Sequence, residues 1–174
     1  MSIPIAGESI WFHKWETDHH VQYVAIVRTA ENAEHGEVNL SWFDEEVETQ
    51  QNNVKNIEQL SDLDNNDYWR RRYSNQDLTW LTGLLETTRV EKGGMVLFRT
   101  WDSEDHWRGG FYSVVVSTLG SSSEPHPSIN LRYINSSGNS ILVSNVKPLE
   151  GYSSEDDAEG NDLWSNIPNI VESM

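Results

Sequence analysis

Tryptophan residues that stand beside an acid recur in this chain, and their chemistry suits the binding of a cation. Trp15 and Trp101 each come three residues after a phenylalanine and directly before an acidic residue. The face of an aromatic ring attracts a cation. A methylated ammonium group keeps its positive charge, loses hydrogen-bond donors and gains apolar surface, so two or three ring faces with one carboxylate would bind it.

The segments around these two tryptophans belong to an internal duplication. Three pairs of segments resemble each other and follow the same order along the chain. The pairs are 8–17 with 94–103, 38–44 with 128–135, and 53–58 with 145–150. The second pair shares the pattern Asn-Leu-x-aromatic-x-Asp/Asn. Similar segments that follow one another in the same order twice along a chain indicate a repeated structural unit.

Each repeat contains four or five short runs of β-prone residues separated by polar turns. This density of short strands is typical of a small, strongly bent antiparallel barrel. Leucines at helical spacing near 76–86 predict one short helix between the repeats. We therefore expect an all-β chain with two SH3-like barrels joined by a linker. The predicted boundaries are 1–60 and 93–151 for the barrels, 61–92 for the linker and 152–174 for an acidic tail.

Composition restricts the partners that the chain can bind. Its 28 acidic residues against 12 basic ones give a formal net charge of −16. Such a charge repels nucleic acid and anionic membranes and favours a basic partner. The chain has no cysteine, which excludes disulfides and thiolate sites. No apolar run reaches the length of a membrane helix and no signal peptide is recognisable, so we expect a soluble intracellular protein.

The repeated aromatic pattern resembles that of the tandem Tudor family and, more loosely, of its Agenet branch. The resemblance lies in Phe-x-x-Trp-Asp/Glu after the first strand, an aromatic residue entering the second strand, and Leu-x-aromatic-x-Asp/Asn at the end of the third. It implies a chromatin-associated nuclear protein that binds a methylated lysine or arginine of a basic peptide, such as a histone tail, in an aromatic cage. It implies no cofactor and no catalysis.

The same resemblance implies the residues of the cage. Each repeat contributes two tryptophans or tyrosines from its strands, one tryptophan after its first strand, and one polar residue. The implied set is Trp15, Tyr23, Trp42 and Asp44 in the first repeat, and Trp101, Trp107, Tyr133 and Asn135 in the second. Asn135 replaces the usual acid, so the first repeat is the better candidate. Whether one barrel or a groove between two barrels binds stays open.

Two other motifs suggest different chemistry. The triplet 18–20, Asp-His-His, resembles a phosphoesterase signature, but the other acidic motifs of such enzymes are absent, and a solvated turn explains it better than a metal site. The arginines at 70–72 could contact phosphate, although in so acidic a chain they more often pair with internal carboxylates. The alternative function is an acidic protein-protein interaction module, of a histone-binding or DNA-mimic type, without methyl recognition.

The acidic segment after residue 151 is too polar to bury anything and predicts a mobile tail. It is followed by an apolar patch of Leu163, Trp164 and Ile167, which either docks on the barrels or engages a protein partner.

Overall fold

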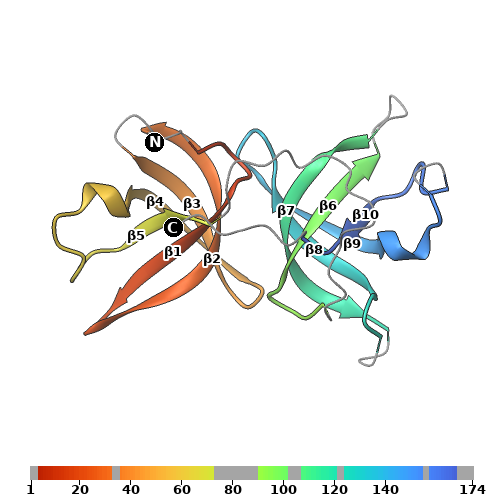
Figure 1. Ribbon diagram of the computed structural model, residues 1–174, viewed down its shortest axis with the longest axis horizontal. Coiled ribbons are helices and arrows are strands. Elements are labelled where there is room, and N and C mark those ends of the chain that lie inside the picture. Colours follow the sequence, from red (N-terminus) through yellow and green to blue (C-terminus); the bar gives the residue numbers. More distant parts are fainter. Residues whose placement is uncertain are drawn as a thin grey trace. The chain divides into compact units, whose positions relative to one another are not determined.

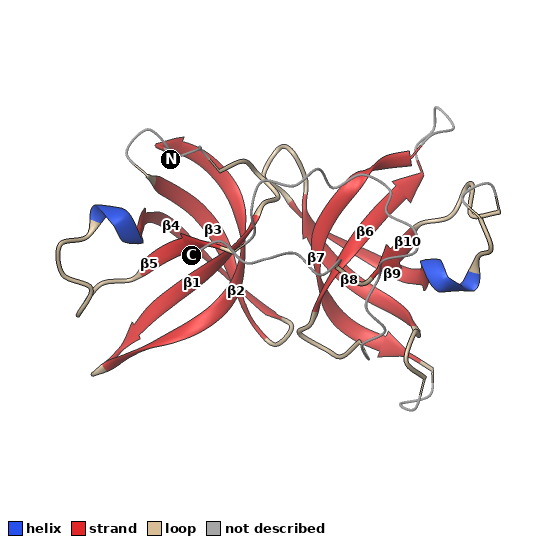
Figure 2. Cartoon of the chain, viewed as in Figure 1, coloured by secondary structure: helices blue, strands red, loops and turns tan. Residues whose placement is uncertain are grey.

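The computed structural model describes residues 4–32, 36–72, 90–101, 107–120, 124–154 and 157–167, except the side chains at 31, 32 and 107–109. Within these residues the chain is all-β, and helical structure is limited to two short 3-10 turns (Figure 2). The chain divides into two compact units, each built on a sheet of five strands (Figure 1). The all-β prediction with two small barrels is therefore confirmed.

The last strand of the first barrel returns to its first strand. Its elements are β1 (Ser9–Glu16), β2 (His19–Asn32), β3 (Glu37–Asp44), β4 (Val47–Asn56), the 3-10 turn η2 (Ile57–Gln59) and β5 (Tyr68–Arg71). β1 to β4 form an antiparallel meander. β5 lies parallel to β4 and antiparallel to β1, and so closes the sheet.

The second barrel repeats this topology. Its elements are β6 (Met95–Trp101), β7 (Trp107–Leu119), β8 (Ser128–Ile134), β9 (Ser140–Pro148), the 3-10 turn η3 (Leu149–Gly151) and β10 (Leu163–Ser165). β10 is antiparallel to β6 and parallel to β9, as β5 is to β1 and β4. The sequence predicted antiparallel barrels. The β4–β5 and β9–β10 pairs are parallel, so each barrel is antiparallel except at one pair of strands.

The asparagine of the repeated Asn-Leu pattern makes equivalent hydrogen bonds in the two barrels. Asn39 donates from Nδ2 to the Thr29 hydroxyl at 2.8 Å and accepts at Oδ1 from the Asn53 N–H at 2.9 Å. In the second barrel, Asn130 makes the equivalent bonds to Ser117 and Asn145 at 2.9 and 3.0 Å. An asparagine amide can donate and accept at once, so it ties the strand before it to the strand after it.

Both barrels bend their long second strand at the same place. The ladder register shifts after Val27 in β2 and after Val115 in β7. Each of these valines also exchanges two backbone hydrogen bonds with the segment before the first strand. A bulge increases local twist, which a five-stranded sheet needs in order to close on itself.

A buried tryptophan on the closing strand completes each core. Trp69 in β5 is fully buried, and its Nε1–H donates to the Gly36 carbonyl at 2.8 Å. Trp164 in β10 is also buried and donates to the Pro127 carbonyl at 2.9 Å. Each lies opposite a buried phenylalanine of the first strand. A buried indole N–H needs such an acceptor, so the bond fixes where the closing strand sits.

The closing strands extend both barrels beyond the predicted boundaries. β5 lies in the predicted linker, and β10 lies in the predicted acidic tail. The apolar patch there docks on its own barrel, with Leu163 and Trp164 buried. The predicted helix near 76–86 lies outside the described residues.

Loss of the closing tryptophan should destabilise the barrel that contains it. Trp69→Phe leaves the Gly36 carbonyl without its donor and should cost about 1–3 kcal/mol. Trp69→Ala also leaves a cavity and should cost about 3–5 kcal/mol. The midpoint of urea unfolding measures both variants. Trp15→Phe, at a partly exposed position, is the control and should change the midpoint little; equal midpoints for all three would contradict the closing role.

Candidate functional site

Tyr23 and Trp42 form an aromatic pair in the first barrel. Their ring centroids lie 4.4 Å apart, with the planes tilted by 40°. Side chains alternate between the faces of a strand, and the register places Tyr23 opposite Phe12, a core residue, so both rings lie on the inner face. Trp42 also stacks on Phe12 at 5.7 Å. Both rings pack against the core yet remain partly exposed.

We call the end of the first barrel that carries the β1–β2 and β3–β4 turns its mouth. The aromatic pair lies near this end, because Trp42 is two residues from the end of β3. Asp44 is the last residue of β3, falls on the same strand face as Trp42, and is exposed. The mouth thus combines two ring faces with a solvated carboxylate, which is the chemistry of a cation site.

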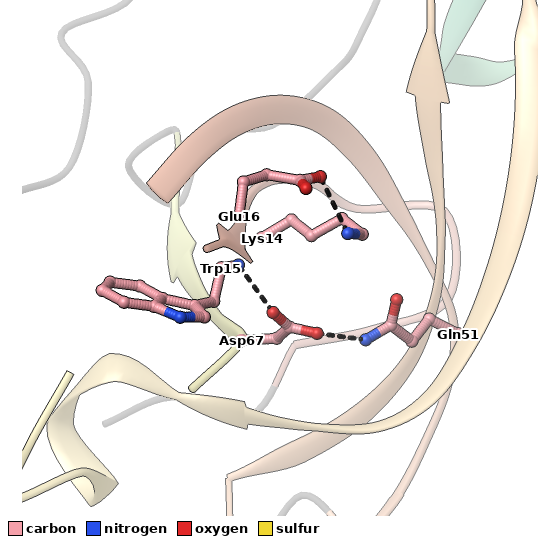
Figure 3. A network of polar contacts seen from close by, with 5 residues as sticks. All are labelled: Lys14, Trp15, Glu16, Gln51 and Asp67. Carbon is pink, nitrogen blue, oxygen red and sulfur yellow. Dashed lines mark hydrogen bonds and ion pairs between the residues drawn. The ribbon is translucent and has the colours of Figure 1, made fainter. Parts of the chain in front are cut away.

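A network of polar contacts joins the strands at the mouth (Figure 3). Asp67, directly before β5, accepts from the Trp15 backbone N–H at 2.7 Å and from Gln51 Nε2 at 2.9 Å. Lys14 donates to Glu16 at 2.8 Å. Asp67 therefore ties the end of β1 to β4, and two charged side chains of β1 stand beside it.

Trp15 lies on the opposite face of β1 from the aromatic pair. It is three positions from Phe12, and its ring meets His20 edge to face at 4.9 Å. Figure 3 shows its indole pointing away from Asp67 and Gln51. The structure therefore brings together Tyr23 and Trp42 from the implied cage and places Trp15 elsewhere.

Trp15 belongs instead to a cluster of rings on the outer face. His13 stacks on Tyr68 at 4.7 Å, and His20 meets Tyr68 at 4.9 Å. Arg70 donates from Nε to His13 Nε2 at 3.1 Å, which requires a neutral imidazole. Burial, with further contributions from Arg70 and His20, lowers the pKa of His13 to about 4.

The arginine triplet only partly follows the expectation of internal ion pairs. Arg71 pairs with Glu8 at 3.5 Å. Burial raises the pKa of Glu8, and Arg71 opposes that rise. Arg70 instead binds His13, and its guanidinium lies 5.9 Å from the Trp11 ring.

The second barrel carries a different set of rings at the equivalent place. Phe98, Phe111 and Tyr133 contact one another, with Tyr133 4.9 Å from Phe111 and 5.1 Å from Phe98. Phe111 lies opposite Phe98, as Tyr23 lies opposite Phe12. The counterpart of Tyr23 is therefore Phe111 and not Trp107.

The other implied residues of the second barrel lie apart from this ring cluster or are already engaged. Trp107 pairs with Trp101 across the ladder, and its side chain lies outside the described part of the chain. Trp101 is partly exposed, three positions beyond Phe98, like Trp15. Asn135 accepts at Oδ1 from the backbone N–H groups of Ser137 and Asn139, both at 3.0 Å. Its oxygen stabilises its own turn and offers no charge.

Of the Asp-His-His triplet, Asp18 lies in the β1–β2 turn, and His19 and His20 begin β2. Asp18 and His19 contact each other at 2.7 Å, while His20 Nε2 contacts the Asn66 carbonyl at 2.8 Å. Among the described residues no group of three or more His, Cys, Asp or Glu side chains is placed to hold a metal ion. No described helix is long and apolar enough to cross a membrane.

Sequence reasoning missed Asp67 and Phe111. Asp67 stands in the pattern Asn-Asp-x-Trp at 66–69, which recurs at 161–164. In both copies the asparagine N–H closes a turn at 3.2 Å, and the aspartate bonds to the end of the first strand. This fourth repeated pattern was the available signal.

Comparison of the chain with protein-family models, curated proteins and solved structures finds no match.

Acid should destabilise the first barrel through His13. Its pKa is about 4 in the folded state against 6.5 ordinarily, so the unfolded chain binds more protons between these values. The contribution of neutral His13 to the free energy of unfolding is complete above pH 6.5 and is lost as the pH falls toward 4. Urea unfolding at about pH 7 and about pH 5 measures this loss. His13→Gln should reduce the difference, whereas His19→Gln, at the exposed first position of β2, should retain it; an unchanged difference in His13→Gln would refute the assignment.

Proposed function

We propose that this chain is a non-enzymatic reader that binds a methylated lysine, or arginine, of a basic peptide at the mouth of its first barrel. The contact between Tyr23 and Trp42 carries the proposal, since it presents two partly exposed ring surfaces above a buried aromatic floor. The rings touch each other, so the methylated group packs on their exposed surfaces.

The chemistry of the mouth favours a methylated cation over an unmodified one. Each desolvated ring face contributes roughly 0.5–2 kcal/mol to binding a cation. Methyl groups add apolar surface that the rings cover. The carboxylate of Asp44 can accept a hydrogen bond from a mono- or dimethylammonium, which retains an N–H, but not from a trimethylammonium. We expect a preference for the lower methylation states.

The first barrel is the better binding unit because its counterpart lacks the carboxylate. Asn135 stands where the first barrel has Asp44, and its oxygen is already engaged by two backbone donors. At the position of Asp44, the described part of the second barrel therefore offers no charge to its rings, which supports a role other than cation binding.

The net charge of −16 supports a basic partner. The tandem Tudor resemblance and this charge together suggest a histone tail, and hence a chromatin-associated protein of the nucleus. The same charge favours the second candidate, an acidic interaction module that binds basic proteins regardless of methylation.

Peptide titration with the full chain tests the two candidates. Unmodified and mono-, di- and trimethylated forms of a lysine-containing histone peptide are compared by fluorescence. The proposed reader binds the mono- and dimethylated forms best. Trp42→Leu, checked for folding, should weaken this binding about tenfold, since one ring face is lost.

Two matched variants locate the site. Tyr133→Leu makes the equivalent change in the second barrel and should leave binding unaltered. Trp15→Ala should also leave it unaltered, because this ring lies on the other face of β1. Equal binding of all peptide forms, falling steeply with salt and indifferent to these variants, would support the acidic interaction module instead.

A further inference from the structure

We propose that Lys14 is a specificity-determining residue of the mouth, because it occupies the Glu16 carboxylate and so withholds it from unmodified lysine. This inference rests on the proposed function of the first barrel.

The register of the sheet places Lys14 at the mouth. Lys14 is two positions beyond Phe12 on β1 and falls on the same face. Because Phe12 lies opposite Tyr23, Lys14 and Tyr23 are diagonal neighbours on that face, a separation that a long side chain can bridge. A positive charge of the chain itself therefore stands beside the ring pair that would receive a ligand cation.

Lys14 is held there by an acid of its own strand. Its Nζ lies 2.8 Å from Glu16 Oε1, and the two side chains are 31% and 40% exposed. The hydrogen bond to Glu16 is the main cause of a raised pKa at Lys14; burial opposes it, and the charges of Glu16, Asp67 and Tyr23 add to it. Lys14 thus stays charged and keeps Glu16 engaged.

An acidic reader needs such a device. A net charge of −16 attracts every basic side chain, whether methylated or not. An unmodified ammonium has three N–H donors and gains most from a free carboxylate, whereas a trimethylammonium has none and gains most from ring faces. Engaging Glu16 internally therefore penalises the unmodified competitor more than the methylated ligand, and discrimination often depends on such a penalty.

The second barrel supports this assignment by contrast. The residue two positions beyond its buried phenylalanine is Thr100, whose hydroxyl donates to Asp162 at 2.8 Å. Of the two barrels, the one whose mouth has the exposed carboxylate of Asp44 also has a lysine at this position. The barrel that has Asn135 in place of Asp44 has an uncharged residue there.

The test compares the affinities of an unmodified and a trimethylated lysine peptide for the full chain. Lys14→Met keeps a long apolar side chain and frees Glu16. It should raise affinity for the unmodified peptide about tenfold, and for the trimethylated peptide by about threefold at most, so that discrimination falls. The double variant Lys14→Met with Glu16→Gln removes the freed carboxylate and should restore the wild-type ratio.

Lys55→Met is the matched control, since it makes the same charge change at an exposed position of β4 in the same barrel. It should leave the affinity ratio unchanged. An unchanged affinity ratio in Lys14→Met, or an equal fall of the ratio in Lys55→Met, would overturn the role of Lys14. If the wild type still preferred methylated peptides, the proposed function would stand. A wild type that binds none of the unmodified, mono-, di- and trimethylated peptides would overturn both.

Discussion

The hydrogen bond from a buried indole N–H to a backbone carbonyl is the constraint on which both barrels depend. Trp69 can bury its ring only where its N–H meets the Gly36 carbonyl, and this requirement places β5 against β1. Asp67 precedes that strand by one residue and consequently reaches the end of β1. The same bond that closes the core therefore also positions Asp67 at the mouth.

The alternation of side chains along β1 separates two chemical environments a few ångströms apart. Phe12 and Lys14 face the core and the mouth, while His13 and Trp15 face outward among other rings. A low-pKa histidine and the proposed cation-binding surface can share one strand because the sheet lies between them. Changes on one face can thus be tested with little direct disturbance of the other.

The two barrels show how one scaffold holds two chemistries. The asparagines that tie the strands, the bulges and the closing tryptophans recur, since every barrel of this topology must satisfy the same backbone groups. The mouth is under no such requirement. Asp44 becomes Asn135 there, and Lys14 of β1 becomes the neutral Thr100 of β6.

The sequence by itself determined the duplication, the all-β fold and the rings near the end of β3, because repeated polar and aromatic spacing reflects repeated backbone demands. It did not reveal the closing strands, which are three or four residues long and return across many intervening positions. Nor did it separate Trp15 from Tyr23 and Trp42, since a shift of one residue reverses the face of a strand. Only the register decided which rings meet, and with them the place of Lys14 and Asp67.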